Sequence, residues 1–406
     1  MNKILILFIL MRYCIFFFLA LLLCANSDNL ELVFHLMGST SHSPHIGFLS
    51  EYFPEGRQEI TNIGKRQAYL LGKLTNYKYV QTIPLLKPIY NSSEIYSRSN
   101  YHNLSIDVAQ SFMSGFYEGT GAKLSPTEMN NPNNLIPPWV SQVDPTVIQV
   151  LQNSSLPFDI TPYNIQVYDQ SADNLLFLES NCSKYSSFVD SVIKGPNFKK
   201  LLTNNDQFIN QICSNLEIDC SNLKEDPTQI YLLLDAIINL NSTNRKLPWM
   251  TSDFMANIGV LFNSLANCIY VDDTRLNNLT KNGYNQFVLD YMSKKINNTI
   301  PIKYIFLSGE RRTILSLLYQ FGNMQATIIP LGTSLTIEMY KRESPTRKPE
   351  DFYLRIYLID TQITVPNLGS DIAYTSFLSF MQTRTLSQND YAKACQSAKS
   401  SLQLEK

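Results

Sequence analysis

Three segments of the chain share one pattern: a short apolar run, then a small polar loop, then a stretch with apolar residues at helical spacing. They begin near residues 32, 94 and 303. Such strand-to-helix units are typical of open α/β folds, which bind ligands at the carboxyl ends of their strands. The pattern therefore predicts an α/β protein whose functional residues lie in the loops that follow these three strands.

The units are defined by their apolar periodicity, and Thr61 is a candidate cap for the first helix. The predicted strands are 32–37, 94–99 and 303–309, and the predicted helices are marked by Ile63, Gln67, Leu70, Leu71 and Leu74, by Leu104, Val108, Ala109, Phe112 and Phe116, and by the apolar run through Leu318. Two later runs, 333–342 and 351–359, read as an antiparallel pair of strands.

The segment 156–300 is mostly helical in pattern, with Asn-rich joints, and we expect it to be an inserted cap. The expected division is a signal peptide at 1–27, a first part of the α/β core at 28–155, the helical cap, and a second part of the core at 301–406.

The N-terminus is an apolar run broken by Arg12 and closed by small residues at 25–27. This arrangement predicts a secretory signal peptide over 1–27, with initiation at either Met1 or Met11. The alternative is an uncleaved signal anchor, because the full run could span a bilayer. No second span follows, so we expect a secreted or lumenal protein, with a lysosome-like compartment among the destinations.

N-glycosylation sequons and cysteines agree with that route. Five cysteines follow the signal, so at least one is unpaired or intermolecular, and the absence of C-x-x-C spacing favours disulfides over metal ligation for the others. The candidate glycosylation sites are Asn91, Asn103, Asn153, Asn181, Asn241, Asn278 and Asn297.

Charge offers no clue to a partner. Charged residues are 17% of the chain and the net charge is −1, which excludes the basic footprint needed for nucleic acid or anionic membranes. A ligand or protein partner has to be argued from a site.

Longer motifs resemble a known family. The stretch PEGRQEITNIGKRQAYLLGKL (54–74) is similar to the P-E-G…L-T-N-x-G-K-R-Q…L-G run that follows the nucleophile loop of histidine acid phosphatases. EIYSRSNYHNLSIDVAQSFMSGFY (94–117) resembles that family's V-R-S-T-D-x-x-R-T segment, and KYIFLSGERRTILSLLYQFG (303–322) resembles its strand ending in S-x-H-D-T-T-L. LTIEMY and FYLRIYLID resemble its closing strands.

The resemblance implies a mixed central sheet flanked by helices, a phosphoglycerate-mutase-like core, a helical cap and no cofactor. It also implies a disulfide between Cys182 and Cys395, with Cys213 and Cys220 as a local pair. The activity it implies is acid phosphatase chemistry, in which arginines grip the phosphate, a histidine attacks phosphorus and an aspartic acid protonates the leaving oxygen.

This sequence departs from the family at every one of those chemical positions. None of the six is intact, so the resemblance implies a pseudophosphatase that neither holds nor cleaves phosphate. The catalytic positions are occupied by Ser39 for the nucleophilic His and by Glu310 and Arg311 for the His-Asp pair, and the phosphate-binding positions by Gly38, His42 and Leu104.

Other readings of the same residues stay open. One is a diverged acid phosphatase, in which Arg311 and Arg312 replace the lost phosphate donors; the simpler interpretation makes them a solvated face. Another is a Ser39 nucleophile with His42 as base, although no G-x-S-x-G elbow is present. A third is a metal site, for which the candidate ligands are His35, His42, His45, His102 and Glu310.

Overall fold

The computed structural model describes residues 28–395 except 46, 48, 131–134, 138, 141–143, 180 and 323–328. The expected signal peptide, residues 1–27, lies outside the described residues. It therefore stays a prediction.

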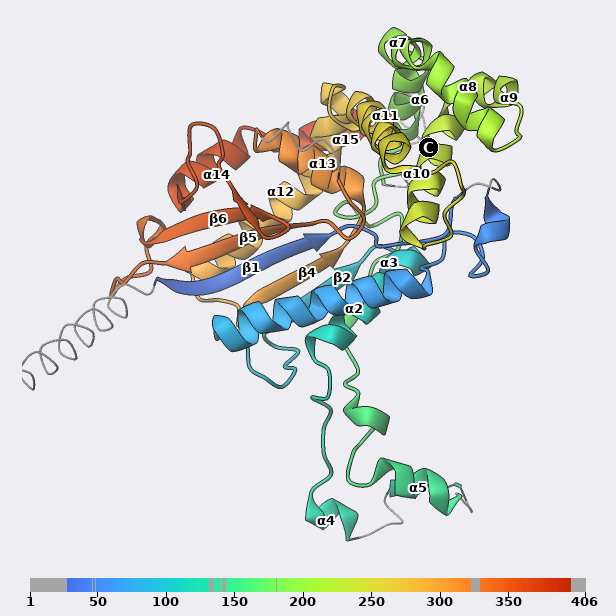
Figure 1. The fold of residues 1–406 in the computed structure, drawn as a ribbon. Coiled ribbons are helices and arrows are strands. Elements are labelled where there is room, and N and C mark those ends of the chain that lie inside the picture. Colours follow the sequence, from blue (N-terminus) through green and yellow to red (C-terminus); the bar gives the residue numbers. More distant parts are fainter. Residues whose placement is uncertain are drawn as a thin grey trace, which may run out of the picture.

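A mixed sheet of eight strands forms the centre of the molecule (Figure 1). Its strand order is β3-β2-β4-β1-β5-β6-β7, with β8 paired to β6. The strands β3, β2, β4 and β1 run parallel, whereas β5, β6 and β7 continue antiparallel. The strands are β1 (Asn29–Met37), β2 (Ile95–Ser99), β3 (Ile165–Val167), β4 (Tyr304–Ser308), β5 (Ser334–Lys341), β6 (Phe352–Leu358), β7 (Thr361–Ile363) and β8 (Ile372–Ala373).

These strands confirm the fold class expected from the sequence. The three predicted unit strands are β1, β2 and β4, and the predicted antiparallel pair is β5 with β6. Parallel register places Met37, Ser99 and Ser308 at one edge of the sheet, since Met37 and Ser99 both pair with Ser308. The three loops that follow therefore start side by side.

Helices cover both faces of the sheet (Figure 1). α2 (Asn62–Asn76), the π-helix η2 (Tyr77–Thr82) and α3 (Asn103–Phe116) cover one face, and α12 (Thr274–Ile296), α13 (Arg311–Gln320) and α14 (Tyr374–Gln382) cover the other. Alternation along β1 supplies both cores: Phe34 and Leu36 face α12–α14, and Val33 and Met37 face α3.

The predicted first helix exists, and the Thr61 hydroxyl accepts a hydrogen bond from the Gly64 N–H as its cap. Its expected apolar face is wrong, however. Leu70 and Leu74 are 52% and 62% exposed, and Ile63 is 37% exposed. The buried face of α2 instead consists of the small residues Gly64, Ala68, Gly72 and Thr75.

Close packing between α2 and α3 explains this inversion. A Cβ on Gly72 would lie 2.0 Å from the Phe112 carbonyl oxygen, and a Cβ on Gly115 would lie 1.9 Å from the Tyr69 carbonyl oxygen. The two backbones are thus in direct contact, which leaves no room for large side chains between them.

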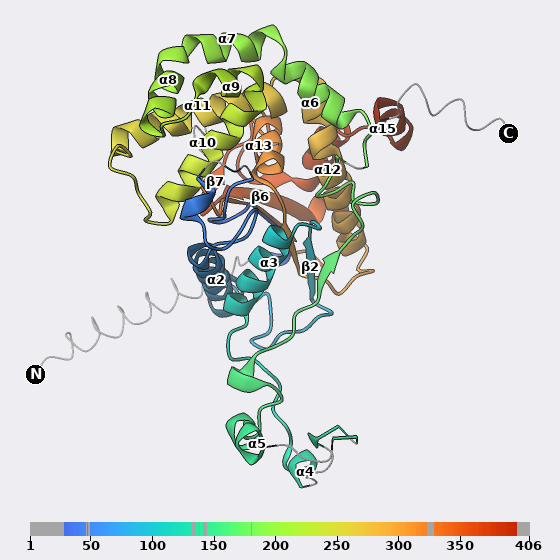
Figure 2. The ribbon, with the colours of Figure 1, turned by 90° about the vertical axis from the view of Figure 1, so that its right-hand side faces the viewer.

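A helical cap stands over the carboxyl edge of the sheet (Figures 1 and 2). Its own apolar core is built by cap helices and by α15 near the end of the described chain. The helices are α6 (Tyr185–Ile193), α7 (Pro196–Asn204), α8 (Asp206–Asn215), α9 (Cys220–Glu225), α10 (Pro227–Ser242), α11 (Ser252–Tyr270) and α15 (Gln388–Cys395). The proposed division at 156 and 300 brackets this cap together with β3 and with α12, whose Val288 and Met292 pack on the sheet.

Two disulfides fix the cap, as expected. Cys182–Cys395 joins the start of the cap to α15, and Cys213–Cys220 closes a short loop between α8 and α9. Cys268 is buried and free. The odd cysteine expected from the count is therefore Cys268.

Between α3 and β3 the chain projects away from the sheet as an arm (Figure 2). The arm carries α4 (Pro126–Met129), α5 (Pro145–Leu151) and η4 (Pro157–Asp159), while η1 (Ser50–Tyr52) and η5 (Pro349–Asp351) lie elsewhere. Within the described residues, no single helix has the length and apolar character for crossing a membrane; only α11 and α12 taken together do, and they are bent by 85°.

Candidate functional site

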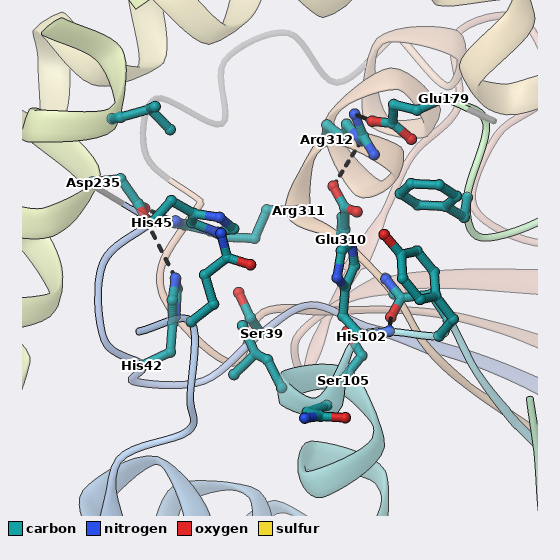
Figure 3. A pocket seen from close by; sticks show the side chains of 18 of the residues that line it. Ser39, His42, His45, His102, Ser105, Glu179, Asp235, Glu310, Arg311 and Arg312 are labelled. Atoms are coloured by element: carbon teal, nitrogen blue, oxygen red, sulfur yellow. Dashed lines mark hydrogen bonds and ion pairs between the residues drawn. The ribbon is translucent and has the colours of Figure 1, made fainter. Parts of the chain in front are cut away.

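The loops after β1, β2 and β4 meet beneath the cap and enclose a cavity of about 710 Å³ (Figure 3). The volume is in the range of small-molecule sites. Five of the six positions singled out in the sequence line this cavity, namely Ser39, His42, Leu104, Glu310 and Arg311. Strand register therefore assembles the site from the segments that the sequence indicated.

Gly38, the sixth position, lies directly behind Arg311. A Cβ on Gly38 would lie 3.0 Å from the Arg311 Cγ, so any larger residue at 38 would press on that side chain. Leu104, on the buried face of α3, forms an apolar part of the wall and is 8% exposed.

His42 is not placed to act as the base for a Ser39 nucleophile. Its Nδ1–H donates to the Thr40 carbonyl oxygen (2.8 Å), and its Nε2 lies 3.3 Å from the Asp235 Oδ2. Both ring nitrogens therefore have partners other than the Ser39 hydroxyl. The geometry gives no support to a Ser39–His42 nucleophile and base pair.

Asp235 enters the site from the cap helix α10 and is one of the site residues that sequence reasoning missed; Glu179 is another. Asp235 forms an ion pair with Arg311, its Oδ2 lies 3.3 Å from the His42 Nε2, and it is 7% exposed (Figure 3). Burial alone would raise the pKa of Asp235, but the Arg311 guanidinium and then His42 hold it well below its usual range. Its signal in the sequence is a lone acid in the apolar run LLLDAII.

A second ion-pair group forms at the start of α13. The Arg312 Nε lies 2.8 Å from the Glu310 Oε2, and the Arg312 Nη1 pairs with Glu179, which follows β3 (Figure 3). Two carboxylates thus share one guanidinium. Burial raises the pKa of Glu310 to about 7. The charge of Arg312 opposes this shift, and the charge of Glu179 adds to it.

These pairs correct the interpretation of Arg311 and Arg312 as a solvated face. Their side chains are only 14% and 15% exposed, because Arg311 points to Asp235 of the cap helix α10 and Arg312 points to Glu179 and Glu310. Neither guanidinium is left free as a phosphate donor. The sequence could not show this, because Asp235 and Glu179 lie far from residue 311 along the chain.

The histidines do not gather as the metal hypothesis requires. His35 faces the α3 side of the sheet, as Val33 and Met37 do, because side chains alternate between the two faces along β1, and its Nδ1 is 2.6 Å from the Tyr304 hydroxyl. Burial lowers its pKa to about 3. His42, His45 and His102 line the cavity, but in the described part of the chain no three His, Cys, Asp or Glu side chains are grouped to hold a metal ion.

Aromatic rings complete the cavity wall. Tyr101 and His102, in the loop after β2, pack on Phe177, with ring centroids 4.6 Å and 5.4 Å apart. Tyr231 and Tyr270 line the cap side. Burial lowers the pKa of His102 below its ordinary value; the charge of Glu179 opposes this shift and that of Arg312 adds to it. This ring is therefore a neutral part of the wall near pH 7.

Comparison with known proteins gives a consistent result. The sequence profile described as histidine phosphatase superfamily (branch 2) matches residues 11–254. A Caenorhabditis elegans protein named "Putative acid phosphatase 5" is 23% identical over 353 residues, which cover 86% of this chain and 74% of that protein.

Solved structures show the same fold at low identity. The apo form of Hafnia alvei phytase superposes with a TM-score of 0.60 at 12% identity, covering 91% of this chain and 98% of that one. The phytase from Citrobacter braakii gives a TM-score of 0.58 at 10% identity, covering 88% and 98%. At identities this low, the superpositions show a shared fold and do not show a shared reaction.

Proposed function

This chain belongs to the histidine phosphatase superfamily (branch 2), and from that premise we propose that it is a pseudophosphatase: a secreted or lumenal glycoprotein that keeps the frame and has lost the phosphatase reaction. One observation carries the proposal. At the family's catalytic positions the cavity has Ser39 in place of the nucleophilic histidine, and Arg311 and Arg312 are paired with Asp235, Glu310 and Glu179. The third lining arginine, Arg57, is exposed and donates to the His45 carbonyl oxygen.

Electrostatics oppose phosphate binding in this cavity. A phosphomonoester carries up to two negative charges and needs unpaired guanidinium forks to replace its water. Here Arg311 is engaged by Asp235, and Arg312 is engaged by both Glu310 and Glu179. Among the described residues, the exposed Arg57 is the one lining arginine without a carboxylate partner, and a single guanidinium falls short of the several that grip a phosphate in this family. An entering phosphate would have to displace those carboxylates and then lie beside them, which like-charge repulsion disfavours.

The reacting groups are missing as well. Ser39 has no base among its described contacts, and Leu104 puts a methyl-bearing wall where a guanidinium would have to reach. In a serine protease, loss of the nucleophile or the base alone costs about a million-fold in turnover. The several replacements proposed here would remove the clamp and the nucleophile together.

A second candidate function, a diverged acid phosphatase, is favoured by one observation. Glu310 has a pKa raised to about 7, so it is protonated over an acidic range and could donate a proton to a leaving oxygen. That function still needs a nucleophile and a phosphate grip.

Secretion and glycosylation are part of the proposal. Two disulfides suit an oxidising compartment. Three of the seven sequon asparagines are exposed, namely Asn103, Asn153 and Asn297, and we expect glycans there first. Peptide mapping of the secreted protein before and after glycosidase treatment, with N-terminal sequencing, tests the glycans and the cleavage after residue 27 together.

The decisive experiment is a vanadate titration beside a phosphomonoesterase screen between about pH 4 and pH 7. We expect neither binding nor turnover above a heat-killed control. Clear wild-type hydrolysis abolished by Glu310→Gln would establish the diverged enzyme instead.

A repaired variant is the positive control. It needs all six changes at once, because the groups act as a unit. Gly38→Arg in particular requires Arg311→Asp, since the Arg311 side chain lies 3.0 Å from the position of the new Cβ. The set is Gly38→Arg, Ser39→His, His42→Arg, Leu104→Arg, Glu310→His and Arg311→Asp.

A further inference from the structure

One end of the cavity carries more negative than positive charge. Asp235 pairs with Arg311 one to one, but Arg312 is shared by Glu310 and Glu179. The acidic end of the cavity, formed by Glu310, Glu179 and Arg312, therefore has one carboxylate more than it has cations. The charged residues among the described lining are Arg57, Arg311, Arg312, Glu59, Glu179, Asp235 and Glu310.

Glu310 is open to the cavity (Figure 3). Its side chain is 31% exposed, whereas that of Arg312 is 15% exposed. Its Oε2 faces the Arg312 Nε at 2.8 Å, and its side chain makes no cap hydrogen bond to α13, the helix that follows it. The carboxylate of Glu310 therefore has surface in the cavity at which a second positive charge can be placed.

Neighbouring groups respond to the excess negative charge. The pKa of Glu310 is about 7, because burial raises it, the charge of Arg312 opposes the shift and the charge of Glu179 adds to it. Burial, and then the charges of Glu179 and Glu310, raise the pKa of Tyr101, so Tyr101 lies near both carboxylates. One guanidinium does not keep both acids fully ionised at neutral pH, and a further cation at this end would stabilise their charged forms.

Aromatic rings stand beside the carboxylates and also line the cavity. The rings of Tyr101 and Phe177 have centroids 4.6 Å apart and meet at 78°, and those of His102 and Phe177 have centroids 5.4 Å apart and meet at 80°. Rings set nearly at right angles form a corner. Ring faces attract organic cations, and both Tyr101 and His102 are neutral near pH 7, since the pKa of the first is raised and that of the second is lowered.

These features favour an organic cation over a metal ion. In the described part of the chain, no three His, Cys, Asp or Glu side chains are grouped to hold a metal. An ammonium ion with carbon substituents needs no such ordered set of ligands, and it gains from ring faces that offer a metal ion no oxygen or nitrogen atom.

We propose that the acidic end of the cavity binds an alkylammonium ion, with its charge against the Glu310 carboxylate and its carbon atoms against the rings of Tyr101 and Phe177. The inference rests on the proposed function, because a cavity that kept the family's unpaired arginines would repel a cation. At about 710 Å³, the cavity has room for the ion and its substituents.

The test uses the purified full-length secreted protein, with N-glycans removed enzymatically because the sequon residue Asn103 lines the cavity. The probes are choline, butylammonium and their neutral analogues, in which carbon or oxygen replaces the nitrogen. Saturation-transfer NMR and calorimetry measure binding at about pH 8, where Glu310 is mostly ionised. We expect at least one cation to bind, and its neutral analogue to bind at least about tenfold more weakly.

Glu310→Gln keeps the shape of the side chain and removes its charge, so cation affinity should fall at least about tenfold. Glu59→Gln is the matched control. Glu59 also lines the cavity, but its backbone pairs with Ser43 in the loop after β1, so the substitution removes the same charge from another part of the lining. It should change affinity less than about threefold at physiological ionic strength, where charges more than about 8 Å apart are screened. Phe177→Leu, which removes a ring face, should weaken choline binding about threefold or more.

Thermal unfolding of each variant checks that it is folded. Equal weakening by Glu310→Gln and Glu59→Gln would overturn the inference, because the effect would then come from the total charge of the cavity. Equal binding of a cation and its neutral analogue by the wild type would overturn it without any variant.

The two proposals fail differently. No binding of either cation, with no vanadate binding either, overturns the ammonium inference and leaves the pseudophosphatase proposal standing. Vanadate binding by the wild type overturns the pseudophosphatase proposal, whatever the result with choline.

Discussion

Asp235→Asn tests the buried ion pair between Asp235 and Arg311. The substitution keeps the shape of the side chain but removes the charge that faces Arg311 and His42. Breaking one partner of a buried pair costs about 3–5 kcal/mol, and side-chain exposures of 10% and 14% place this pair near the lower end. With about 0.8 kcal/mol/K of unfolding entropy for a chain of this size, a loss of about 3 kcal/mol lowers Tm by ~4 °C.

Differential scanning calorimetry at pH 7 measures this shift, and a pH series checks its cause. Asp235 has a depressed pKa in the folded state, so its stabilising effect is present above its unfolded pKa and is lost as the pH falls through the folded value. The difference between wild type and variant should therefore shrink below about pH 4.

Asp206→Asn is the matched control, because Asp206 pairs with Lys224 at the surface, where the side chains are 50% and 39% exposed. It should shift Tm far less than Asp235→Asn, because solvent screens an exposed ion pair. Asp235→Asn should also expose Arg311 and produce weak vanadate binding. If Asp235→Asn and Asp206→Asn shift Tm equally, the buried Asp235–Arg311 pair stabilises the fold no more than a surface pair does.

Three further predictions concern stability. The pKa of Glu310 is raised when folded, so the wild type should lose stability as pH rises from about 4.5 to 7, and Glu310→Gln should remove that slope in a Tm series; an unchanged slope contradicts the assignment. Cys182→Ser opens a 213-residue separation and should cost roughly 5 kcal/mol in the chain-entropy model, against about 2 for Cys213→Ser across 7 residues; urea unfolding that ranks them the other way counts against this. Gly115→Ala should lower Tm by several degrees because its Cβ would meet backbone, whereas Gly47→Ala, with nothing within 4 Å, should not; equal Tm values refute the close helix packing.

Local pattern was sufficient to predict much of the fold and the place of the site. The strands β1, β2 and β4 are short apolar runs, and α3 buries Leu104 and Phe112, the residues that its periodicity marked. Because parallel strands align their carboxyl ends, the loops at Ser39 and Glu310 could be expected to meet.

The remaining features depend on contacts that no local pattern encodes. Asp235 reaches Arg311 only because α10 folds back over the sheet edge, and Glu179 reaches Arg312 from the segment after β3. The face of α2 predicted to be buried is exposed, because α3 packs closely against the small face that contains Gly72 and leaves Leu70 in solvent. Contacts between residues far apart in the sequence therefore determine that Arg311 and Arg312 are paired with carboxylates.

The packing of residues 54–74, which resemble the family's run after the nucleophile loop, gives this segment a structural role. Two of its three glycines sit where no other residue fits: a Cβ on Gly64 would lie 2.0 Å from the Ser41 carbonyl oxygen, and one on Gly72 would lie 2.0 Å from that of Phe112. The signature thus records an architectural constraint, which persists whether or not a reaction takes place. Members of such a family can therefore lose or change their reaction and still keep this stretch. A match to it indicates common descent, and enzymatic turnover should not be inferred from it.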